Sequence, residues 1–135
     1  LAPLPFFLFP VSPLAIVKYY RGTIYPAKAG AAMIVTTADV IPGQAVQVLG
    51  LVRGNIVTSK NIGRDLMAGV KSIVGGEIVS YTQMTDEARQ VAEDRMVTAA
   101  QNLGADAVVA MRFASDSIAE GTIEILAYGT AVKFA

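Results

Sequence analysis

The chain contains neither cysteine nor histidine in its 135 residues. The first absence excludes disulfides and thiolate nucleophiles, and the second removes the side chain that most often acts as a general acid or base near neutral pH. Thiolate and imidazole are also the ligands that select zinc and copper. The sequence therefore lacks most nucleophilic and soft-metal chemistry, and the missing cysteine is typical of a cytoplasmic protein.

Charge is also scarce. Charged residues are 16% of the chain and hydrophobic residues 53%, against about 25% and about 45–50% in ordinary soluble domains. Eleven basic and eleven acidic side chains give a net charge of zero, so we expect no nucleic-acid partner. A small domain with so little charge is expected to hide part of its surface in a homo-oligomer.

Residues 1–32 differ in composition from the rest of the chain. They hold five of the six prolines and no acidic residue. The apolar run from Leu1 to Val17 is shorter than the ~20 residues of a spanning helix, and prolines interrupt it, so we expect no membrane segment. We predict a domain over 33–135, preceded by an N-terminal extension (1–32) that is dispensable for the fold. The alternative is an extended arm whose phenylalanines dock on a neighbour.

The body reads as four strands and two helices. We expect the first two strands at Met33–Thr37 and Ala45–Val52, followed by a break at Arg53-Gly54-Asn55 and a brief resumption over Ile56–Thr58. The first helix is expected after Ser59 and ends at Gly75-Gly76, and the second runs from Thr82 or Thr85 to Gly104. The last two strands are expected at Ala105–Phe113 and Thr122–Phe134. The predicted order is β-β-α-α-β-β. It indicates an α+β fold with helices on one face of an antiparallel sheet.

Two of these elements carry further expectations. Both faces of Ala45–Val52 are largely apolar, so this strand should be covered on both sides. Asp86 and Glu87 are expected in the first turn of the second helix, near its positive end. Arg95 falls inside the apolar stripe of that helix. It is either a snorkelling arginine or one held at a subunit contact by a carboxylate.

The last two strands should form a hairpin with residues 114–121 as its loop. This register places Arg112 opposite Glu124 or within two residues of it, with Arg112 on the same face as Val108 and Ala110. Glu124 shares its face with Leu126 and Tyr128. We expect the two charges to pair on an apolar, subunit-covered surface, where a lone charge is costly.

Several phrases of the body resemble the YbjQ-like family, whose members are bacterial and archaeal, of unknown function, and often labelled heavy-metal-binding. The phrases are Met33-Ile34-Val35-Thr36-Thr37, Leu49-Gly50-Leu51-Val52-Arg53-Gly54, Gly63-Arg64-Asp65, Gly75-Gly76-Glu77, Gly104-Ala105-Asp106-Ala107-Val108, Arg112-Phe113 and Glu124-Ile125-Leu126-Ala127-Tyr128-Gly129-Thr130-Ala131-Val132. The resemblance covers residues 33–135 in order. It implies a dodecin-like α+β fold and a ring-shaped homopentamer.

The metal label fits these residues poorly. The chain offers carboxylates, carbonyls, hydroxyls and thioethers, which can hold a hard cation but do not select zinc or copper. No loop with calcium-type spacing is visible, and no cofactor is evident.

Two functions follow from the charged residues. The first is a non-catalytic homo-oligomeric module that binds a small ligand or metal ion. Its candidate ligand-binding residues are Arg64, Asp65, Gly75, Gly76, Glu77, Arg112 and Tyr128, with Arg95 and Glu124 as charges that support the oligomer. The same charges can instead pair across subunits. The second function is an enzyme in which Glu77 or Asp65 is a general base and Tyr128 a donor, but no nucleophile elbow or phosphate loop supports it.

Overall fold

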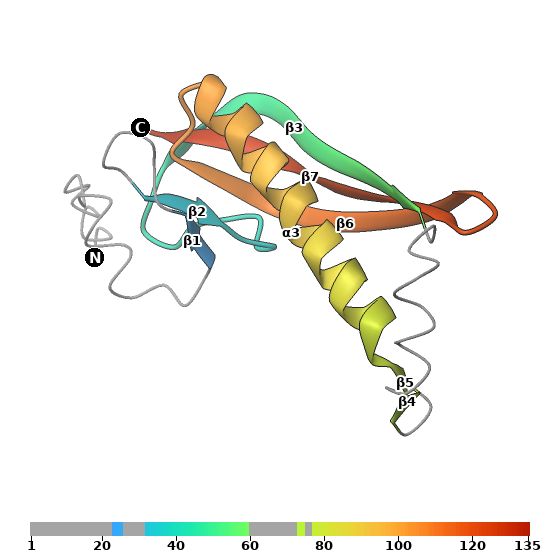
Figure 1. Cartoon of the computed structure of the whole chain (residues 1–135). Helices are drawn as coiled ribbons and strands as arrows, with labels where there is room; N and C mark the ends of the chain where they lie inside the picture. The colour runs from blue at the N-terminus through green and yellow to red at the C-terminus, as the bar shows by residue number, and fades with distance from the viewer. Residues whose placement is uncertain (1–22, 26–31, 60–72, 75–76) are drawn as a thin grey trace, which may run out of the picture.

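The structure, a computed structural model, describes residues 23–25, 32–59, 73–74 and 77–135. Its elements are β1 (Thr23–Tyr25), β2 (Met33–Val35), β3 (Val46–Ser59), β4 (Ile73–Val74), β5 (Glu77–Ile78), α3 (Val79–Asn102), β6 (Ala107–Ala119) and β7 (Thr122–Phe134). Five strands form one sheet in the order β1-β2-β6-β7-β3, and β4 pairs with β5 alone. Helix α3 crosses one face of the five-stranded sheet (Figure 1).

The α+β class is confirmed, but the sheet is not purely antiparallel. β2 runs parallel to β6, whereas the β6–β7 and β7–β3 pairings are antiparallel. The first expected helix lies mostly outside the described residues. At its C-terminal end the prediction is wrong, because Ile73–Val74 form β4.

β3 is one continuous strand of 14 residues, so the predicted break at Arg53-Gly54-Asn55 is wrong. Gly54 pairs with Ala127 inside the ladder. A Cβ at Gly54 would collide with the backbone of α3 at Ala92 O and Met96 N. The glycine therefore allows the close approach of a helix, which is one of the usual reasons for a glycine inside a strand.

Two of the three register shifts in the sheet decide which side chains share the face opposite α3. The first lies between Val48 and Gly50. The extra residue changes which side of the sheet the following side chains of β3 point to. Val48 and Leu51 are consequently exposed, so the expectation that this strand is covered on both sides does not hold in the single chain. The second bulge lies between Val109 and Arg112, where Ala110 has a φ of 52°.

The apolar stripe of α3 is confirmed at Ala88, Ala92, Met96 and Ala100, which are buried, whereas Leu103 at its end is 51% exposed. The helix begins earlier than expected. Its N-cap is Ile78, without a side-chain hydrogen bond, and its first turn holds no acidic residue. Thr85 lies within the helix, and its Oγ1 donates to Thr82 O at 2.9 Å. The C-terminal end is as predicted, with Gly104 at a φ of 75°.

The β6–β7 hairpin is longer than predicted. β6 continues to Ala119, so the expected loop at 114–121 shrinks to Glu120 and Gly121. Arg112 pairs with Tyr128, and Glu124 pairs with Asp116. The prediction that Arg112 lies opposite Glu124 or within two residues of it is therefore wrong, because the residue opposite Arg112 is four positions from Glu124. The second bulge also turns Arg112 away from the face of Val108.

The core has two parts, one on each side of the sheet. The main part lies between α3 and the sheet, and its fully buried members include Ala92, Met96 and Val108. The smaller part lies on the opposite side, where Ile41 covers Ile34 and Val132. This second cover reaches only the end of the sheet near β2.

Three residues of the N-terminal extension belong to the sheet. Thr23–Tyr25 pair antiparallel with β2, and Tyr25 packs against the main core. Gln90 Nε2 donates a hydrogen bond to Tyr25 Oη at 3.0 Å. The structure thus ties part of the extension to the domain. That the rest of it is dispensable stays a prediction.

Tyr25 makes the stability depend on alkaline pH. Burial of the phenol, its hydrogen bond with Glu93 and the charges of Glu93 and Asp94 raise its pKa above the ordinary value, with the Gln90 hydrogen bond acting against them. The fold thus favours the neutral phenol. The free energy of unfolding should be constant below pH ~10, where unfolded tyrosine titrates, and fall as the pH rises further.

Urea unfolding between pH 8 and 11 measures this effect, with Tyr25→Phe as the matched variant. The variant has no phenol at this position and should show a shallower decline than the native chain. Equal slopes for the two proteins would mean that Tyr25 titrates as it does in the unfolded chain.

Candidate functional site

The side of the sheet opposite α3 is uncovered over much of β3, β6 and β7. We call this surface the outer face, and it comprises Leu51, Arg53, Asn55, Val57, Arg112, Ala114, Asp116, Glu124, Leu126 and Tyr128. Strand alternation puts these residues on one side. Cross-strand register then sets them in rows.

Large apolar side chains of the outer face are open to solvent. Leu51 is 69% exposed, Val57 51% and Tyr128 37%. Within the described ranges, the covering segment around Ile41 does not extend over them. Several large apolar groups exposed on one side of a sheet are typical of a surface that contacts a partner.

The charges of the outer face lie in two rows. One row is Arg53–Tyr128–Arg112, and the other is Val57–Glu124–Asp116. Arg112 Nη1 donates to Thr37 O at 3.0 Å and to Met111 O at 2.8 Å, which turns its guanidinium toward the segment after β2. The two arginines therefore do not converge on one point above Tyr128.

Glu124 and Arg53 complete this surface. Glu124 Oε1 accepts a hydrogen bond from Asn55 Nδ2 at 2.8 Å. Arg53 has no hydrogen-bond or ion-pair partner in the part of the chain that the structure describes. The only ion pair of that part joins Arg89 and Asp86, on α3. Among the described residues, the charged side chains of the outer face thus form no ion pair within the single chain.

The structure brings together only some of the residues predicted for the site. Arg112 and Tyr128 lie directly opposite each other on β6 and β7. Arg64, Asp65, Gly75 and Gly76 fall outside the described residues. Glu77 belongs to β5, at the free end of α3 and away from the five-stranded sheet (Figure 1). Glu77 and Tyr128 therefore do not form the acid–base pair of the enzyme hypothesis.

Arg95 is an exposed side chain of α3, which agrees with the snorkelling alternative, and it also reaches the neighbouring strand. Its Nη1 donates to Asn55 O at 2.6 Å, on the strand at the end of the sheet order. Among the described residues, no carboxylate pairs with it. The guanidinium thus satisfies a carbonyl on the edge of β3, which explains why an arginine lies inside the apolar stripe of α3.

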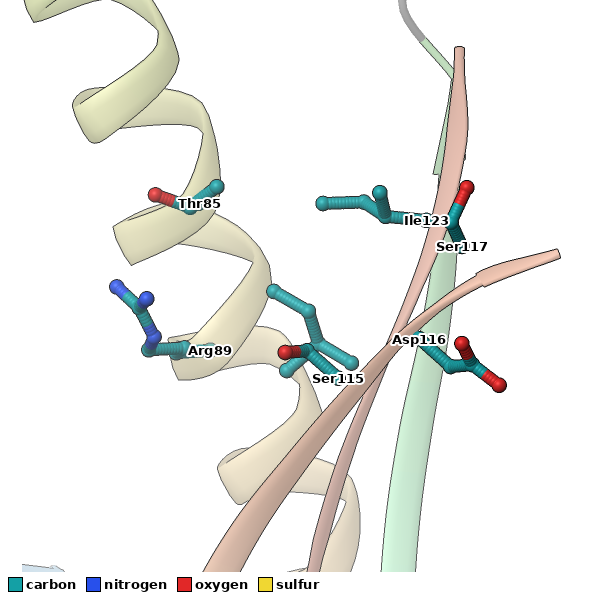
Figure 2. Close-up of a pocket in the computed structure, with 7 residues that line it drawn as sticks. Thr85, Arg89, Ser115, Asp116, Ser117 and Ile123 are labelled. Atoms are coloured by element: carbon teal, nitrogen blue, oxygen red, sulfur yellow. The ribbon is translucent and has the colours of Figure 1, made fainter. Parts of the chain in front are cut away.

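A second candidate is a cavity of about 240 Å³ between α3 and the β6–β7 hairpin. It is lined by Thr85, Arg89, Ser115, Asp116, Ser117, Ile123 and Ile125. Figure 2 shows the Asp116 carboxylate directed away from the helix. Arg89 Nη1 pairs with Asp86 at 2.7 Å. Hydroxyls and isoleucines therefore dominate the lining, and it presents no general base.

The described ranges also contain no group of three or more acidic residues that could hold a metal ion. None of their helices combines the length and apolarity needed to cross a membrane.

Comparison with known proteins agrees with the family resemblance of the sequence. The model of the YbjQ family, described as "Putative heavy-metal-binding", matches residues 33–135. A UPF0145 protein of Vibrio campbellii is 61% identical over 102 residues, which cover 75% of this chain and 98% of that protein. A UPF0145 protein of Thermotoga maritima is 53% identical over 102 residues, covering 75% and 96%.

A solved structure from Pediococcus pentosaceus is also similar. It is a protein of unknown function in the DUF74 family, and it has a TM-score of 0.55 at 15% sequence identity. The match covers 76% of this chain and 98% of that chain. At this identity the likeness shows the fold alone.

Proposed function

The chain belongs to the YbjQ family, as its sequence phrases indicate, and we propose that it is a non-catalytic module that works as a homo-oligomer and binds a small ligand. The observation that carries the proposal is the outer face. Its exposed leucine, valine and tyrosine side chains, together with unpaired charge, suit a contact between protein subunits better than a surface in water.

The free strand edges support a ring. Among the described strands, β3 pairs only with β7, and β6 pairs only with β7 from Arg112 onward. The two edges differ in sequence, so a contact between them is head-to-tail, and head-to-tail contacts close into rings when the rotation permits. For one such ring, the family resemblance implies five subunits.

The ligand is proposed to occupy the cavity between α3 and the hairpin. Its volume is about 240 Å³, below the ~300–1,000 Å³ typical of sites for drug-sized molecules. Ser115 and Ser117 supply hydroxyls, and Ile123 and Ile125 supply an apolar floor. Such a lining suits a small, partly apolar molecule.

Native mass spectrometry of the untagged full chain, purified from its own cells, tests the proposal. It reports the subunit number and a retained small molecule in one measurement. The expected result is an assembly of several chains with added mass. A bare single chain would contradict both parts of the proposal.

Zinc and copper are expected to bind weakly. The chain has no cysteine or histidine, and oxygen ligands alone do not select these ions. A hard cation on carboxylates remains compatible with the proposed function. Calorimetric titration with zinc should show no stoichiometric site of sub-micromolar affinity. A site of that strength would require an all-oxygen cluster and would overturn the prediction.

A further inference from the structure

The charges of the outer face are segregated by sign along the strands. The basic row (Arg53–Tyr128–Arg112) and the acidic row (Val57–Glu124–Asp116) are four residues apart on every strand. At about 3.3 Å per residue, the rows are about 13 Å apart. Between them lies a neutral row, Asn55–Leu126–Ala114. The surface is therefore positive at one end, negative at the other and uncharged in the middle.

This arrangement is complementary to itself under one symmetry only. Consider two outer faces that are stacked on each other, with a two-fold axis between them over Leu126. If this axis is parallel to the sheets and perpendicular to the strands, it reverses the strand direction. It sets the basic row of one copy against the acidic row of the other. A two-fold axis parallel to the strands would set like charges opposite each other, which is costly in an interface.

We propose that the outer face docks on the outer face of a second copy of this chain, related by the two-fold axis perpendicular to the strands. The inference rests on the proposed homo-oligomer and specifies one of its contacts. Each β6 then lies over the partner's β6, so Arg112 faces the partner's Asp116. On the central strand, Glu124 faces the partner's Tyr128, and Leu126 faces the partner's Leu126.

Local hydrogen bonds prepare these side chains for the contact. Thr37 O and Met111 O hold one nitrogen of Arg112, which leaves its other N–H groups free for a carboxylate. Asn55 holds one oxygen of Glu124 and leaves the second oxygen to accept the partner's phenol. Side chains that are already held lose less conformational entropy on binding. Stacked sheets are about 10 Å apart, a gap that two facing side chains can fill.

The two-fold contact does not compete with a ring. A ring closes through the strand edges, whereas the two-fold contact uses the sheet side, so it would join two rings or two single chains. In either case the assembly contains an even number of chains. Loss of this one contact should halve the mass of the assembly.

Asp116→Arg tests the contact, because it puts a second positive charge opposite Arg112 at two symmetric positions. Asp116 is exposed on an edge strand, so the variant should fold. Light scattering is expected to give half the mass of the native assembly. Glu87→Arg makes the same change of charge on the exposed side of α3 and should leave the mass unchanged.

A mixture of two variants with opposite charge changes is the decisive experiment. Arg112→Asp alone should also halve the mass, because two carboxylates then face each other. An equimolar mixture of the two variants should restore the full mass, since every facing pair again has opposite signs. If circular dichroism shows that Arg112→Asp is unfolded, Arg53→Glu mixed with Glu124→Arg replaces the pair, since Arg53 lies diagonally across from the partner's Glu124.

The outcomes separate this inference from the proposed function. A native assembly whose mass Asp116→Arg does not change would overturn the two-fold contact and leave the homo-oligomer standing. Folded variants that do not regain the full mass on mixing would overturn it as well. A native chain that is monomeric would overturn both.

Discussion

Gly54→Ala should destabilise the domain by about 3 kcal/mol, the upper part of the range for overpacked cores. The added methyl group would meet Ala92 O and Met96 N, and it would also lie 2.7 Å from Arg95 Cβ. The first two are backbone atoms of α3, so no rotation of a side chain relieves the collision. The helix has to move away from β3, which opens the main core.

Urea unfolding of the variant and the native chain measures this loss. Gln47→Ala is the control on the same strand, because Gln47 is exposed, and surface changes of this kind usually stay within about 0.5 kcal/mol. A loss at Gly54 no larger than that at Gln47 would show that α3 does not approach β3 as closely as the structure indicates.

Met96→Ala is expected to cost about 2–5 kcal/mol, the range for truncating a fully buried large side chain. Met96 has no exposed surface and lies in the main core between α3 and the sheet. Its neighbours along the stripe are alanines at 92 and 100. These small residues cannot expand to fill the cavity, so the loss should lie in the upper part of the range.

Met96→Leu separates the effect of side-chain volume from the effect of the thioether. It keeps the volume nearly constant and should cost less than about 1.5 kcal/mol. The two variants are compared by thermal and urea unfolding under the same conditions. Equal losses would mean that the site demands a thioether and not merely a side chain of this size, contrary to a core held by packing.

The sequence predicts the parts of the fold whose signals are periodic. The stripe of α3 and the strand Thr122–Phe134 agree with the structure. The errors fall where a tertiary contact overrides a local signal. Gly54 looks like a strand break, yet it is the closest approach of α3. Ser115, Asp116 and Ser117 look like a loop, yet pairing with β7 keeps them in β6.

The candidate site could be predicted only in part for the same reason. Arg112 and Tyr128 were expected at the site and do lie side by side. Their relation to Glu124 was missed, because the length of the hairpin turn sets the register and the bulge at Ala110 sets the face. The sequence does not place Arg53 at the site, because Gly54 makes its segment look like a strand break. Strand alternation across Gly54 is the signal that would have placed it on the outer face.

Light scattering of the full chain at micromolar concentration, beside Leu51→Asp, tests most directly whether the outer face is a subunit contact. Leu51 is 69% exposed in the single chain, so the substitution should alter the monomer's stability by no more than about 0.5 kcal/mol. In an assembly it would bury a carboxylate in the contact, at a desolvation cost that the neighbouring Arg53 offsets only in part. We expect the native chain at a multiple of 14.2 kDa and the variant at a lower mass. A native chain at 14.2 kDa, or a folded variant with the native mass, would contradict the account.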